Sequence, residues 1–202
     1  LCDAGLLVRL PHGYALGARI IEWDLRMRSS EPLLSAGRTV VDKLVAETGL
    51  ELLLSQLYGE RVINVHYEHS AANALLNLGR GSVMPLFRSS TSRVILANLP
   101  PRRLRAIYEA SAQDPDARAI GADWKSFSRA LAEVRQRGYQ ISESELRTDR
   151  VGVAAPIFGE HGHVLGSITL IGTTSRLHAF REDYITGLVA QAAADITRHI
   201  GG

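Results

Sequence analysis

The stretch GYQISESELRTDRVGVAAPIFGEHGHVLGSITLIG, from Gly138 to Gly172, decides the fold of this chain. It contains two apolar runs, residues 151–158 and 164–171, and the four residues 159–162 separate them. Two apolar runs of strand length around a short, glycine-bearing loop predict a β-hairpin. The rest of the fold can be built outward from this hairpin.

The predicted strands carry small residues, among them Gly152, Ala154 and Gly166, and two hydroxyls, Ser167 and Thr169. Small residues on a sheet leave open space above it or let another backbone approach closely. Apolar walls with a few placed hydroxyls are typical of a small-molecule pocket. A tightly packed sheet under helices gives the same pattern, and the sequence leaves both interpretations open.

Composition narrows the class of protein. A chain of 202 residues allows one ordinary domain with an extension, or two small domains. A net charge of +2 is too balanced for a chain whose main role is to grip nucleic acid. The single cysteine, Cys2, excludes an internal disulfide or a zinc–thiolate cluster. No apolar run is long enough to span a membrane, and no signal peptide is visible, so we expect a cytoplasmic protein.

The N-terminal region differs from the rest. Residues 1–15 contain two short apolar pieces around Pro11-His12-Gly13, which predicts a hairpin at the end of a preceding domain. Residues 16–30 form a predicted helix on which Leu16, Ile20, Trp23 and Met27 lie at spacings of 4, 3 and 4. This spacing is typical of a coiled-coil or linker helix packed on a partner, and also of a surface helix packed on its own domain.

The remaining elements follow in a clear order. A helix at 32–48 precedes a second hairpin, 50–58 and 61–68, and residues 70–83 are interpreted as a flap over a cavity or a plain surface loop. Further on we expect a strand at 84–87, helices at 93–99, 102–112, 124–137 and 185–200, and loops at 113–121 and 173–179. Hairpins separated by helices predict an α+β fold, a mostly antiparallel sheet with flanking helices.

Four hydroxyl residues, 89–92, precede the helix at 93–99. Hydroxyls at a helix start are first of all capping residues. They also surround free backbone N–H groups at the positive end of the helix dipole, where a carboxylate or phosphate can bind.

Several motifs together resemble the C-terminal part of an IclR-type bacterial transcriptional regulator. They run in order through the chain: Gly13-Tyr14, Leu16-Gly17, Met84-Pro85-Leu86, Arg135, Gly138-Tyr139, Ser142, Glu145 and Val153-Ala154-Ala155-Pro156-Ile157. The resemblance implies a GAF-like effector-binding domain at 31–202, a linker helix at 16–30, and at 1–15 the tail of a winged helix-turn-helix. It also implies operator DNA as a partner of that N-terminal domain, a homodimer or homotetramer, and an effector that is a small carboxylate or aromatic acid.

The resemblance also implies an effector site. Ser89, Ser90 and Thr91 would take the anionic end of the effector. The other implied positions are Ser142 or Glu143 at the mouth, Pro156 on the wall, Thr169 and Ile171 on the floor, and Leu75 and Met84 in an apolar lid. Ser90 and Thr91 stand where the family usually has smaller residues, and some carboxylate-binding members carry a hydroxyl at the position of Ile171, so the effector would be less polar or differently shaped.

Catalytic and metal-binding patterns are weak. His66 and His69 are three apart, but the predicted strand ends between them, so a shared metal face is doubtful. No serine lies in a G-x-S-x-G elbow, and no carboxylate pair has a known catalytic spacing. We therefore expect no enzyme activity, cofactor or metal. The alternative is a stand-alone sensor or small enzyme on the same fold, which would show turnover or a bound flavin or haem.

Overall fold

The computed structural model describes residues 1–69, 78–143 and 149–201. It divides into two compact units, Leu1–Ser35 and Ala36–Gly202. In the smaller unit, strands β1 (Leu7–Leu10) and β2 (Gly13–Leu16) form the predicted antiparallel hairpin. Helix α1 (Arg19–Ser30) follows. The helix begins at Arg19 instead of Leu16, because Leu16 pairs with Leu7 and so belongs to the hairpin.

The larger unit holds a six-stranded antiparallel sheet among the described residues, in the order β5-β4-β3-β8-β7-β6. The strands are β3 (Glu51–Tyr58), β4 (Arg61–Glu68), β5 (Val83–Met84), β6 (Gln140–Glu143), β7 (Arg150–Phe158) and β8 (Val164–Thr173). Both predicted hairpins, β3–β4 and β7–β8, are confirmed. Of the strand predicted at 84–87, only Met84 lies in a strand, because β5 begins one residue earlier and ends at Met84.

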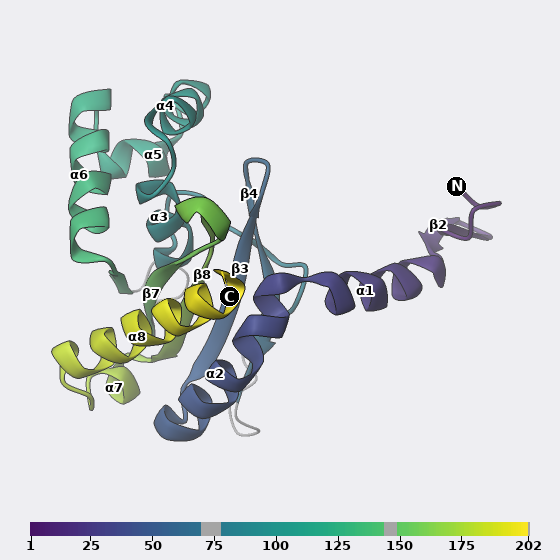
Figure 1. Cartoon of the computed structure of the whole chain (residues 1–202). Coiled ribbons are helices and arrows are strands. Elements are labelled where there is room, and N and C mark those ends of the chain that lie inside the picture. The colour runs from purple at the N-terminus through teal and green to yellow at the C-terminus, as the bar shows by residue number, and fades with distance from the viewer. Residues whose placement is uncertain (70–77, 144–148, 202) are drawn as a thin grey trace. The chain divides into compact units, whose positions relative to one another are not determined.

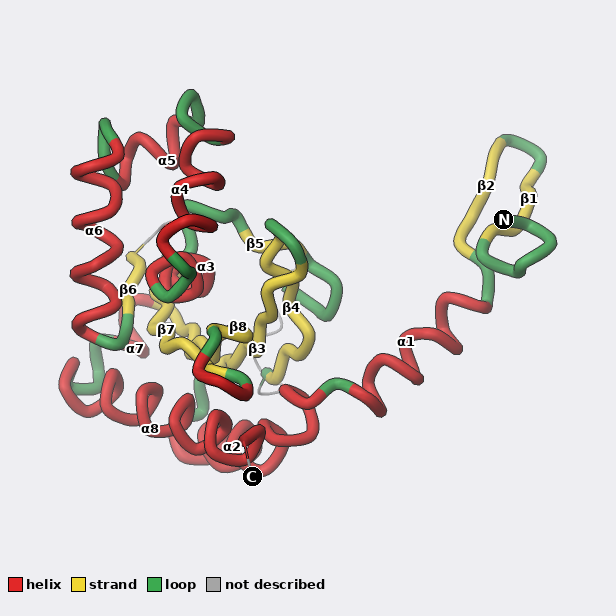
Figure 2. Tube along the Cα trace, turned by 45° about the horizontal axis from the view of Figure 1, so that its top comes forward, coloured by secondary structure: helices red, strands yellow, loops and turns green. Residues whose placement is uncertain are grey.

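Helices cover both faces of this sheet (Figures 1 and 2). Helix α8 (Glu182–Gly201) and the part of α2 (Pro32–Thr48) that follows Ser35 lie on one face. A Cβ added to Gly37 of α2 would lie 2.9 Å from Leu54 Cδ1, so this glycine lets α2 lie close against β3. The opposite face carries α3 (Ser90–Ala97), with α4 (Pro101–Ala110), α5 (Pro115–Ile120) and α6 (Trp124–Arg137) beyond it. This arrangement confirms the predicted α+β fold.

Two short helices occupy segments predicted as loops. In α5, the Asp114 side chain accepts a hydrogen bond from Asp116 N, and in α7 (Thr174–Leu177) the Thr173 hydroxyl accepts from Arg176 N. Such N-terminal caps stabilise a helix of a single turn or two. Periodicity gives no signal over so few residues.

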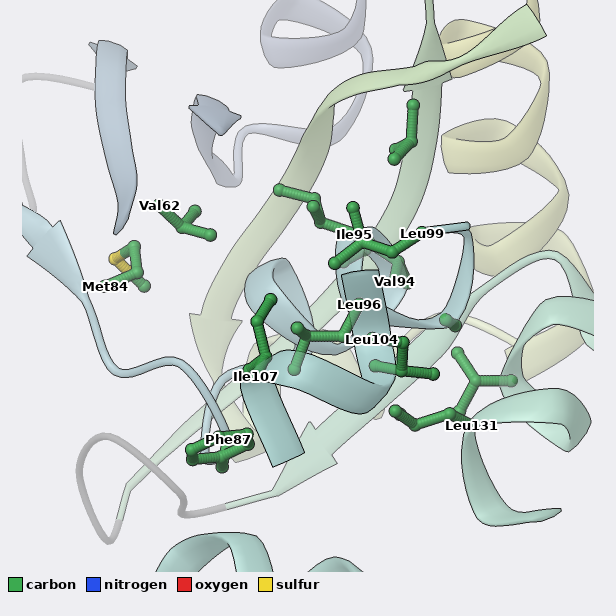
Figure 3. Close-up of a cluster of buried hydrophobic side chains, with 14 of the residues drawn as sticks. Val62, Met84, Phe87, Val94, Ile95, Leu96, Leu99, Leu104, Ile107 and Leu131 are labelled. Carbon is green, nitrogen blue, oxygen red and sulfur yellow. The ribbon is translucent and has the colours of Figure 1, made fainter. Parts of the chain in front are cut away.

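Helix α3 is the centre of the core on its side of the sheet. Figure 3 shows Val94, Ile95 and Leu96 of α3 among side chains from α4, α6 and β4. Every residue of α3 except Arg93 is buried. The position of α3 is therefore fixed by apolar packing, and its first turn is held against the sheet.

Candidate functional site

The first turn of α3 meets the sheet through hydroxyl groups. Ser89 caps the helix, because its Oγ accepts a hydrogen bond from Ser92 N at 3.1 Å. Ser142 Oγ of β6 donates to Ser90 Oγ at 3.0 Å, and Thr91 Oγ1 lies 2.9 Å from Thr169 Oγ1 of β8. The predicted site residues Ser89, Ser90, Thr91, Ser142 and Thr169 are therefore brought together, and all of them are buried.

Gly152 of β7 makes this close approach possible. A Cβ added there would lie 3.0 Å from Ser90 Oγ and 3.3 Å from Ser142 Oγ, which is tighter than nearly all real Cβ contacts. Of the two interpretations of the small residues, close packing of a helix on the sheet therefore holds at this position.

The hydroxyl groups at the first turn of α3 have more protons than the hydrogen bonds among them use. Each hydroxyl has one proton to donate. Ser142 is the donor to Ser90, and either Thr91 or Thr169 is the donor to the other, so each pair uses one of its two protons for the hydrogen bond between them. Within the described part of the chain, one proton of each pair is thus left without an acceptor. The first-turn N–H groups of any helix also lack intrahelical acceptors, so this end of α3 is rich in donors.

A charged group that the sequence analysis does not identify lies on the same face of the sheet. Arg150 Nη1 of β7 donates to Glu51 Oε1 of β3 at 2.8 Å, and the Tyr67 hydroxyl of β4 donates to Glu51 Oε2 at 2.7 Å. The side chains of Arg150 and Glu51 are only 6% and 3% exposed. Burial, and then the hydrogen bond to Glu51, raise the pKa of Tyr67 well above its usual value, so its phenol stays protonated. We call Arg150, Glu51 and Tyr67 the buried triad.

Strand register places the buried triad beside the hydroxyls. Gly152 lies opposite Ile171, and Ile171 lies opposite Glu51. Side chains two residues apart on a strand share a face, so Arg150 lies on the same face as Gly152. To reach Glu51, the Arg150 side chain passes over β8 next to Ile171. The buried triad, Ile171 and the hydroxyl cluster therefore lie side by side on the α3 side of the sheet. The hydroxyl cluster is the group of Ser90, Thr91, Ser142 and Thr169.

The other predicted site residues lie elsewhere. Met84 is part of the apolar core around α3. Glu143 is exposed, with an oxygen 3.6 Å from His178 Nε2. Leu75 falls outside the described residues.

Pro156 lines a separate groove of about 500 Å³. Its floor is apolar, and two arginines, Arg135 and Arg198, lie among its walls. The lining residues are Asn98, Arg135, Gly138, Ala155, Pro156, Phe158, Ala190, Ala193, Ala194, Thr197 and Arg198. The groove lies between α8 and the C-terminal ends of α3 and α6, whereas the hydroxyl cluster is at the N-terminal end of α3.

Residues 1–69, 78–143 and 149–201 contain no group of three or more side chains that could hold a metal ion. Within the same ranges, no helix is long and apolar enough to cross a membrane.

The fold of the chain is that of known bacterial regulators. A crystal structure of an IclR transcriptional regulator from Silicibacter sp. TM1040 superposes with a TM-score of 0.80 at 27% identity, covering 100% of this chain and 80% of that one. The Thermotoga maritima IclR superposes with a TM-score of 0.79 at 19% identity, covering 100% of this chain and 82% of that one. These structures define the class of the fold, which is that of the GAF-like C-terminal domain of IclR proteins.

The family follows from sequence. The family described as bacterial transcriptional regulator IclR C-terminal matches residues 26–198. The HTH-type transcriptional regulator KipR of Bacillus subtilis is 26% identical over 200 residues, which cover 98% of this chain and 80% of KipR. The chain belongs to the IclR family of bacterial transcriptional regulators. Its relatives are regulators and not enzymes, which confirms both the predicted family and the prediction that the chain is no enzyme.

Proposed function

We propose that this chain is the small-molecule-sensing and oligomerisation part of an effector-responsive transcriptional regulator. The effector is a small carboxylate or an aromatic acid, and it controls operator binding by a winged helix-turn-helix to which residues 1–15 belong. Residues 16–30 are the linker, and residues 31–202 are the effector-binding domain. A protein that acts on DNA in this way works in the cytoplasm.

One observation carries the proposed site: the hydroxyl pairs at the first turn of α3 retain donor protons that the described residues do not use. Buried donors normally find partners, and an unsatisfied one costs about 1–3 kcal/mol. A carboxylate oxygen accepts several hydrogen bonds and is favoured at the positive end of a helix dipole. An organic acid at the first turn of α3 would satisfy both requirements.

A thermal-shift screen of small carboxylates and aromatic acids tests this site. The acids that bind should raise the unfolding midpoint of the chain, since a ligand that binds only the folded state stabilises it. Thr91→Trp fills the site and should abolish the shift. Ser90→Ala, which removes an unused donor while adding no volume, should weaken binding by about tenfold, in line with the loss of one hydrogen bond to a charged group.

Ala194→Trp is the matched control, because Ala194 lines the groove near Pro156 and is exposed. It should leave the shift unchanged. A shift that Ala194→Trp abolishes and Ser90→Ala leaves intact would move the effector to the groove. Circular dichroism of each variant without ligand separates loss of binding from loss of fold.

We further propose that a second copy of the chain covers α1. No residue of α1, which is described along its whole length, is buried, yet Ile21, Trp23, Leu25 and Met27 are 74%, 45%, 66% and 49% exposed. Large apolar side chains gathered on one short helix are typical of an interaction surface.

Sedimentation velocity tests the oligomer. The chain should sediment as a dimer or tetramer, and Trp23→Glu should shift it toward the monomer because a charge would be buried at the contact. Lys43→Glu, an exposed change on α2, is the control and should leave the assembly intact. A wild-type chain that is monomeric at high concentration would contradict the proposal.

A further inference from the structure

We propose that Arg150 determines which acids the site accepts, because its Nε–H binds an uncharged oxygen of the effector. This inference rests on the proposed function. It narrows the effector to an organic acid that carries a keto or hydroxyl oxygen a few carbon atoms away from its carboxylate.

Arg150 has one buried hydrogen-bond donor that the described residues leave without an acceptor. Arg150 binds Glu51 through Nη1, whereas its Nε is buried and has no hydrogen-bond partner among the described residues. The guanidinium group presents its donors in a fixed plane, so Nε–H points in a set direction while Nη1 holds Glu51. Since a charged donor without a partner is costly to bury, an acceptor from outside the described residues would complete the site at Nε.

The charge of Glu51 decides which kind of acceptor is favoured at Arg150 Nε. Glu51 already balances Arg150, and the two groups are in direct contact. An anionic acceptor at Nε would be attracted by Arg150 and also repelled by Glu51, so its net electrostatic gain is smaller than it would be beside an unpaired arginine. A neutral keto or hydroxyl oxygen accepts the hydrogen bond without this repulsion. The buried triad thus favours an uncharged acceptor over a second carboxylate.

The distance between the first turn of α3 and Arg150 sets the length of the effector. Neighbouring strands lie roughly 4.8 Å apart, so the backbone at Gly152 and at Glu51, which are separated by β8, lies roughly 10 Å apart. Arg150 reaches over β8 toward Glu51, which shortens the gap that a ligand has to bridge. An acid of about five carbon atoms, with its carboxylate at the first turn of α3 and its second oxygen at Arg150, would lie over Ile171.

Three five-carbon acids probe this arrangement by isothermal titration of the whole chain. Pentanoate has no second acceptor, 4-oxopentanoate has a neutral one, and pentanedioate has a charged one. We expect 4-oxopentanoate to bind at least about tenfold more tightly than pentanoate, as when a buried donor gains or lacks its partner. Pentanedioate should bind less tightly than 4-oxopentanoate.

Two variants assign the preference to the buried triad. Arg150→Lys keeps a positive charge for Glu51 and removes Nε–H, so 4-oxopentanoate and pentanoate should bind it equally. Glu51→Gln still accepts from Tyr67 but leaves Arg150 unbalanced, so pentanedioate should become the tightest of the three. Arg135→Lys, in the groove near Pro156, is the matched control and should keep the wild-type order.

The outcomes separate this inference from the proposed function. The role of Arg150 would be overturned if Arg150→Lys kept the wild-type preference. It would also be overturned if the wild type bound 4-oxopentanoate and pentanoate equally, as it would if water alone satisfied Nε. Either result would leave effector sensing intact. Binding of other acids but none of these three would also overturn it. If no acid in the whole screen binds, the proposed function fails, and this inference fails with it. Should Arg150→Lys not fold, the order of the acids on Glu51→Gln decides.

Discussion

Helices α1 and α3 carry similar proportions of apolar residues but stand in opposite environments. All of α1 is exposed or half-buried, whereas α3 is buried at every position except Arg93. The difference shows that an apolar residue indicates a contact but not its partner. The contacts of α3 are made within its own unit and fix the candidate site, while for α1 the proposed partner is a second copy of the chain.

The largest expected effect on stability comes from removing the buried charge of Arg150. Arg150→Met should lower the free energy of unfolding by about 3–5 kcal/mol, because it leaves Glu51 buried without its partner. Urea denaturation measures the loss. Arg19→Met on α1 removes one side of an exposed pair with Glu22 and should change stability far less.

A double variant checks the cause of this loss. Arg150→Met combined with Glu51→Leu should be more stable than Arg150→Met alone, because replacing both charges leaves no unpaired ion. If Arg150→Met proved as mild as Arg19→Met, the ion pair would not be buried in solution as the structure shows it.

The next largest effect on stability comes from truncating an isoleucine in α3, and an isoleucine in α1 gives the comparison. Ile95→Ala in α3 should cost about 2–5 kcal/mol, since Ile95 is fully buried and truncation leaves a cavity. Ile21→Ala in α1 should change the monomer's stability by no more than about 0.5 kcal/mol, as exposed positions usually do. Because oligomer contacts at α1 would add to its effect, the urea titrations belong at the lowest workable protein concentration. Equal losses would mean that α1 is buried within its own chain.

The smallest effect tests the hydroxyls that dock α3. Thr169→Val removes the oxygen 2.9 Å from Thr91 Oγ1 and should cost about 0.5–1.5 kcal/mol, the net value of one hydrogen bond. Thr39→Val, at an exposed position of α2, serves as the control. A neutral Thr169→Val would show that apolar packing alone fixes the first turn of α3.

The hairpins and long helices could be predicted because their signal is local. Two apolar runs around a glycine-bearing loop indicated β7 and β8, and the spacing of apolar side chains indicated α8. The apolar spacing predicts a start of α1 that is too early, because Leu16 fits the helical spacing but belongs to strand β2. The helix α5 was missed although Asp114-Pro115 carries a capping signal, because only a few residues follow it.

The candidate site was predicted in part for a different reason. The resemblance to a family led to Ser90, Thr91, Ser142 and Thr169, which the fold does bring together. The buried triad was not found, because Glu51 and Arg150 are 99 residues apart and meet only through the register of three strands. A single acidic residue at the start of the apolar run 50–54 was the one local sign of an interior charge.

Hydrogen–deuterium exchange with and without the most stabilising acid of the screen tests the central claim most directly. If the effector binds at the first turn of α3, exchange should slow at the backbone amides of α3 and at Thr169 of β8, and it should not change at Ala190–Arg198 of α8, which line the groove. Slower exchange at Ala190–Arg198 with no change in α3 would contradict the account and place the effector in the groove.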